Sequence, residues 1–130
     1  MKLSNLLTIK AVIATFFGIA FILLPAPLMS IYGVALDSSG ALMVQMAGAS
    51  LVGIGLICWF NRNADSQVLS GITLSLFIAD GIGFVVILMG MLSGQMNALG
   101  WTTAAIYLLF TLGLGYFHFL KPEGVPLQEA

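Results

Sequence analysis

The chain is built from long, nearly uninterrupted apolar stretches separated by short polar connections. Four stretches, at residues 8–24, 41–60, 67–92 and 98–120, have about the 20 residues that an α-helix needs to cross a bilayer. The third is longer than that and should tilt or protrude. The pattern predicts an all-α polytopic membrane protein, a bundle of four transmembrane helices in a single domain, residues 1–130.

The connections indicate where the helices begin and end. Pro25 should stop or kink the first span. Residues 27–33 are too apolar for a free loop, and we expect a short interfacial helical segment that starts at Pro27 and is capped by Gly33. Asp37, at the start of an Asp-Ser-Ser-Gly sequence, is a good N-cap for the second span.

Composition supports a membrane location. The 130 residues are 60% apolar and 7% charged, with a mean hydropathy of +1.10, whereas a soluble domain carries roughly 25% charged residues. So few charges cannot cover a surface that faces water, so we expect the lipid bilayer to be the main solvent. The net charge of −1 offers no basic surface, which excludes a nucleic-acid partner.

All basic side chains can be placed on one side of this membrane. They are Lys2, Lys10, Arg62 and Lys121. The segments expected on the other side, at 25–40 and 93–97, contain no Lys or Arg. The positive-inside rule then predicts cytoplasmic termini in a bacterial inner (plasma) membrane. In this arrangement Lys10 extends, or snorkels, to the inner interface.

The N-terminal stretch also resembles a signal peptide, with basic residues before a short apolar run. After Leu24, however, the chain reads Pro25-Ala26-Pro27, which is no small-x-small cleavage site. We therefore expect the first span to be retained.

Asp80 lies near the middle of the third span. A charged Asp at that depth costs roughly 2.5–3.5 kcal/mol, so it should be buried, paired or protonated. With every basic residue placed at the inner edge, no cationic partner is expected, and the candidate partners by depth are Ser50, Tyr107 and Thr15. Asp80 is then either a proton, cation or ligand site, or an interhelical hydrogen-bonding residue.

Small residues recur at every fourth position of two spans. They are Gly71, Ser75, Ala79 and Gly83 in the third span, and Ala41, Gln45, Ala49 and Gly53 in the second, where Gln45 interrupts them. Such stripes let helices approach closely. Packing within the chain is the simpler interpretation, and contact with another subunit or a second copy is the alternative.

Signatures of enzymes and of metal sites are absent from the sequence. His118 could ligate a haem or a chlorin, or be an ordinary polar residue at the interface. The chain has one histidine, His118, so a metal site with several histidines within one chain is excluded. It has one cysteine, Cys58, so a zinc site made of several thiolates is excluded as well. We therefore predict no catalytic residues and no metal ligands, and the sequence names no cofactor.

Three short sequences carry a resemblance to a known family. Residues 24–27 (Leu-Pro-Ala-Pro), residues 32–33 (Tyr-Gly) and residues 47–49 (Ala-Gly-Ala) resemble the small four-helix membrane proteins of the DoxX-like kind. The resemblance covers about the first half of the chain and implies a fold more than an activity. Small multidrug transporters are similar in outline only, because their essential acid lies in the first helix and this one has none.

Three functional hypotheses follow. The favoured one is a non-enzymatic accessory or structural subunit of a larger inner-membrane complex, with other membrane subunits or a second copy as partners. It is favoured by low charge, small soluble segments and the small-residue stripes. The alternatives are a small transporter or ion-coupled carrier that uses Asp80, and a redox-associated membrane protein of the DoxX-like kind.

Overall fold

The computed structural model describes residues 2–120, so Lys121 and the polar tail lie outside the described residues. The described chain forms the helices α1 (Leu3–Leu23), α2 (Pro25–Ile31), α3 (Ser38–Asn61), α4 (Ser66–Leu92) and α5 (Gly100–Gly115), followed by the π-helix η1 (Tyr116–Leu120). Four helical segments are long and apolar enough to cross a membrane: α1, α3, α4, and α5 together with η1. The predicted fold class, an all-α membrane protein with four transmembrane helices, is confirmed.

Capping residues set the helix boundaries. The Asp37 side chain accepts a hydrogen bond from the Gly40 N–H at 2.7 Å, as expected of the N-cap of α3. Asp65 does the same for α4, accepting from the Val68 N–H at 3.0 Å. Gly33, with φ of +80°, adopts the left-handed conformation that commonly ends a helix, here just after α2.

The first spanning helix begins at Leu3, earlier than the apolar stretch that starts near residue 8. Leu3, Leu6 and Leu7 have exposed fractions of 2%, 8% and 0%. Their spacing places them on one face of the helix, and burial of that face extends α1 through polar residues that the hydropathy pattern had left outside.

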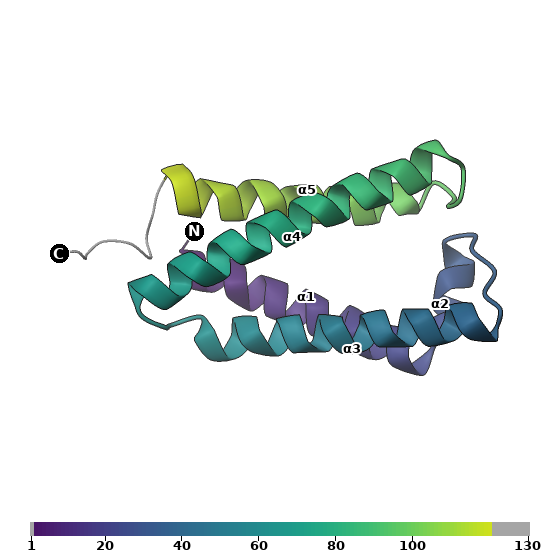
Figure 1. Cartoon of the computed structure of the whole chain (residues 1–130), viewed down its shortest axis with the longest axis horizontal. Coiled ribbons are helices and arrows are strands. Elements are labelled where there is room, and N and C mark those ends of the chain that lie inside the picture. The colour runs from purple at the N-terminus through teal and green to yellow at the C-terminus, as the bar shows by residue number, and fades with distance from the viewer. Residues whose placement is uncertain (1, 121–130) are drawn as a thin grey trace.

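The spanning helices pair into two antiparallel hairpins (Figure 1). In the first hairpin α1 packs along α3, and in the second α4 packs along α5. Figure 1 shows the hairpins close together at the end of the bundle where α1 begins and farther apart at the opposite end, where α2 lies. We call these the Leu3 end and the α2 end.

Glycines allow the close approach of helices within each hairpin. A Cβ at Gly18 would lie 2.7 Å from the Gly48 carbonyl oxygen, so α1 and α3 touch backbone to backbone. In the second hairpin, a Cβ at Gly83 would overlap the ring of Tyr107. This is the small-residue packing by which membrane helices associate.

The two hairpins are joined at both ends of the bundle. A buried apolar core near the Leu3 end comprises Leu3, Leu6, Leu7, Ala11, Cys58, Leu76, Phe110, Leu114 and Phe117. At the α2 end, the Asn97 side chain donates a hydrogen bond to the Ile31 carbonyl oxygen at 2.9 Å. The Asn97 backbone N–H donates to the Tyr32 carbonyl oxygen at 2.9 Å, and the Thr103 hydroxyl donates to the Tyr32 hydroxyl at 3.2 Å.

The first prediction concerns the glycine contact in the first hairpin. We expect Gly18→Ala to lower the free energy of unfolding by about 1–3 kcal/mol, since the new methyl group would overlap the backbone of α3. Gly90→Ala is the matched control, because no atom lies within 4 Å of a Cβ at Gly90. It should be neutral or stabilising by up to about 1 kcal/mol. Unfolding by SDS in mixed micelles, followed by circular dichroism, measures both, and equal effects would contradict this packing.

Candidate functional site

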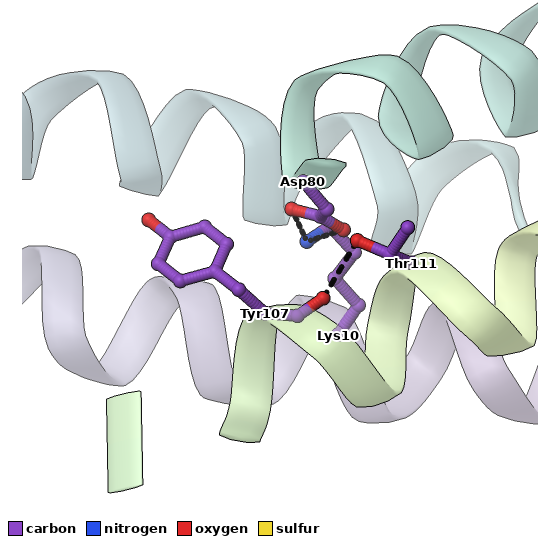
Figure 2. Close-up of polar contacts among 4 residues, drawn as sticks. All are labelled: Lys10, Asp80, Tyr107 and Thr111. Atoms are coloured by element: carbon purple, nitrogen blue, oxygen red, sulfur yellow. Dashed lines mark hydrogen bonds and ion pairs between the residues drawn. The ribbon is translucent and has the colours of Figure 1, made fainter. Parts of the chain in front are cut away.

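A buried ion pair joins the two hairpins. The Lys10 ammonium of α1 donates hydrogen bonds to both carboxylate oxygens of Asp80 on α4, at 2.9 and 2.8 Å (Figure 2). Lys10 is 8% exposed and Asp80 is 5% exposed. Within residues 2–120 this is the one ion pair, and it lies inside two of the candidate membrane spans.

This pair corrects two expectations from the sequence. Asp80 does have a cationic partner in the chain, and Lys10 does not extend to the interface. Because α1 begins at Leu3, Lys10 lies two turns inside the helix, roughly 10 Å from its start. Placing the start of the span near residue 8 had put Lys10 at the membrane edge, too far from Asp80 to pair with it.

The geometry compensates both charges within the protein. An unpaired Asp near the bilayer centre costs roughly 2.5–3.5 kcal/mol, and a buried pair offsets such a cost only when its hydrogen bonds are well formed. Here both carboxylate oxygens accept bonds, and the Lys10 nitrogen also lies 4.6 Å from the centre of the Phe110 ring. That cation–π contact gives the ammonium a second favourable partner.

Each spanning helix contributes one ionisable side chain to this region. Cys58 of α3 is fully buried and lies near Lys10 and Asp80. Tyr107 of α5 also lies nearby, and Figure 2 shows its ring directed away from the pair. We call Lys10, Cys58, Asp80 and Tyr107 the polar centre.

Two buried polar atoms near these helices have no hydrogen-bond partner among the described residues. One is the hydroxyl oxygen of Thr73, a residue with an exposed fraction of 1%, and the other is Nδ1 of His118. Thr73 precedes Asp80 by seven residues on α4, which places both on one helical face. Sequence reasoning missed Thr73, although this spacing was a signal that could have found it.

The structure does not gather all the predicted partners around Asp80. Ser50 is exposed on α3 and donates to the Met46 carbonyl oxygen of its own helix at 3.2 Å. Thr15 is half-buried on α1, against Gly55 of α3. Among the described residues, none of the three candidates donates a hydrogen bond to Asp80, whose donor is Lys10.

His118 lies in η1, where its ring makes an edge-to-face contact with Phe119, with 4.6 Å between ring centres. It is half-buried, and its unpartnered Nδ1 is a feature of packing at the Leu3 end rather than of the polar centre. A ligand role for His118 stays a prediction.

The predicted small-residue positions divide between internal and outward surfaces. Gly83 packs against Tyr107, inside the second hairpin. Gly53 and Gly71 have no atom within 4 Å of the position a Cβ would take. Ala49, Ser75 and Ala79 are exposed. Most of the α4 stripe therefore points away from the contacts within the chain, whereas in the α3 stripe the Gln45 side chain donates a hydrogen bond to the Ile22 carbonyl oxygen of α1 at 3.0 Å.

Comparison of the chain with protein-family models, with curated proteins and with solved structures found no match in any of the three. The DoxX-like resemblance accordingly stays a prediction. The chemistry of the site is therefore inferred from its geometry alone. The ion pair can hold the hairpins together, and the Asp80 carboxylate can accept a proton.

The second prediction tests the ion pair as a unit. Lys10→Met and Asp80→Leu, each alone, should destabilise the protein by about 3–5 kcal/mol, because each leaves an unpaired buried charge. The double variant should recover most of this loss, since an apolar pair of similar size is often neutral or stabilising. Unfolding free energies in mixed micelles complete the double-mutant cycle, and additive single effects would show that the pair does not act as a unit.

Proposed function

We propose that this protein is a non-enzymatic accessory or structural subunit that packs within a larger bacterial inner-membrane complex. The observation that carries the proposal is the unoccupied space at Gly53 on α3 and Gly71 on α4. These two glycines lie inside spanning helices and belong to the small-residue stripes, yet, like Gly90 of α4, they meet no neighbour within 4 Å.

The glycines that do contact a neighbouring helix show that glycine in this bundle permits close helix packing. Gly18, Gly48 and Gly83 each lie where a side chain would collide with the facing helix. A glycine inside a helix costs roughly 0.5–1 kcal/mol relative to alanine, and close packing against another helix is what offsets that cost in a membrane. At Gly53 and Gly71 the helix that packs closely would come from another subunit.

The proposed orientation places both termini in the cytoplasm. Lys2 and Arg62 lie at the Leu3 end of the bundle, and the 93–97 connection at the α2 end has no basic residue. Lys10 no longer contributes to this asymmetry because its charge is matched by Asp80. The orientation therefore rests on the remaining basic residues.

The third prediction concerns the partner surface. In native membranes solubilised with a mild detergent, we expect the protein to migrate in a complex larger than the monomer. Gly71→Leu and Gly53→Leu should reduce the fraction in that complex, because each fills space where a partner helix would pack. Val86→Leu is the control. Val86 is 60% exposed on α4 and lies outside the small-residue stripe, so a leucine there fills no space at a stripe glycine. Native gel electrophoresis and mass spectrometry of the co-purified chains are the measurements.

Migration of the wild-type protein only as a free monomer would end the subunit proposal. Recovery of copies of this chain alone would replace it with self-assembly.

A second candidate function, an ion-coupled carrier, is favoured by the polar centre. The polar centre contains a buried Lys10–Asp80 ion pair inside two spanning helices, and charged residues within a membrane mark ion or proton pathways in many transporters.

The fourth prediction tests the carrier. If the protein moves protons, vesicles containing it should dissipate an imposed pH gradient faster than empty vesicles, as read by a trapped pH-sensitive dye. Asp80→Asn should abolish the difference because the amide cannot take up the proton, whereas Asp80→Glu should retain part of it. A wild-type rate equal to that of empty vesicles, or full flux in Asp80→Asn, would exclude this candidate.

A further inference from the structure

We propose that Asp80 is a proton-binding site whose occupancy controls whether the two hairpins remain joined at the Leu3 end. This inference goes beyond the proposed subunit function and does not depend on it. It starts from the division of the bundle into two bodies that are held together partly by one pair of opposite charges.

Each hairpin has its own internal packing, which does not involve the ion pair. Gly18 and Gly48 bring α1 and α3 together, and Gly83 lies against Tyr107 between α4 and α5. Loss of the Lys10–Asp80 pair would therefore leave both hairpins intact. It would change only how they are joined.

Protonation of Asp80 changes the net charge of the Lys10–Asp80 pair from zero to +1. A proton from water binds one carboxylate oxygen, so the Lys10 ammonium loses its counter-charge. An unpaired ammonium in a nearly dry site is strongly disfavoured. The cation–π contact with the Phe110 ring offsets only part of this cost.

Within residues 2–120, no other group near the pair can replace the lost negative charge. The other ionisable side chains nearby are Cys58 of α3 and Tyr107 of α5, whose ring is directed away from the pair, and α4 itself supplies only Asp80. A thiol and a phenol are uncharged when protonated, so acidification gives Lys10 no new counter-ion. Lys10 must then reach water, and the nearer water lies at the Leu3 end, roughly 10 Å away. Between them is the apolar core around Leu7 and Leu114, which must open.

The position of Thr73 indicates that the proton also enters from the Leu3 end. Its hydroxyl is buried without a partner among the described residues. It lies on the Asp80 face of α4, two turns nearer the Leu3 end. A buried hydroxyl of this kind is a site for an ordered water, and it provides a polar step between that end and the carboxylate.

The experiment measures the distance between the hairpins as a function of pH. Spin labels are attached at Phe60→Cys on α3 and Leu112→Cys on α5, because both positions are exposed, at 76% and 60%, whereas the native Cys58 is fully buried and is kept. Distances are measured by double electron–electron resonance on the isolated protein in lipid nanodiscs. We expect one distance population at neutral pH and a second, longer population on acidification.

Two variants serve as fixed reference states. Asp80→Asn mimics the protonated acid and should show the longer population at every pH. The Lys10→Met/Asp80→Leu double variant has no charge to lose and should keep the shorter distance at every pH. A labelled protein with native Lys10 and Asp80 whose distances do not change with pH would overturn the proposal.

If Asp80→Asn does not fold, the pH response of the Lys10→Met/Asp80→Leu double variant still tests whether the ion pair is the switch. If the double variant responds to pH as the native pair does, another group is the switch and the proposal fails. Absence of a larger membrane complex would refute the subunit function but would not affect this measurement on the isolated chain.

Discussion

Among the interactions that join the two hairpins within residues 2–120, the buried Lys10–Asp80 pair is the one that cannot be partly lost. Membrane helices are not driven together by the hydrophobic effect, because lipid tails are as apolar as their side chains. The specificity of association must come from close packing and from polar contacts. An apolar core can lose a methyl group and repack at a modest cost, but removing either Lys10 or Asp80 leaves the other as a buried, unpaired charge.

Small residues perform the complementary task within each hairpin. Gly18 and Gly48 are required by the contact between two backbones, and Gly83 by an aromatic ring. Internal packing therefore explains these glycines but not Gly53, Gly71 or Gly90, of which Gly53 and Gly71 belong to the stripes. The same physical rule, applied to the outer surface of the bundle, is what supports a partner in the membrane.

The sequence was sufficient for the fold because helix length and capping are local properties. The apolar stretches revealed the four spans, and Asp37 and Gly33 marked helix ends where the structure has them. The ion pair was not predictable in this way, since its members are 70 residues apart and their depths depend on where α1 begins. Stripes with a period of four were equally ambiguous, because the spacing is the same whether a face points inward or outward.

Stability alone does not explain why a lysine and an aspartate occupy this position. A well-packed apolar pair would often hold two helices as firmly, without the cost of removing two charges from water. An ion pair supplies two properties that an apolar contact lacks. It fixes the register of α1 against α4, because Lys10 has only one carboxylate within reach on that helix. It also makes the contact sensitive to a proton, which an apolar pair cannot sense. Both properties concern the relative position of the hairpins, so the pair is best understood as a control on that position rather than as a source of stability.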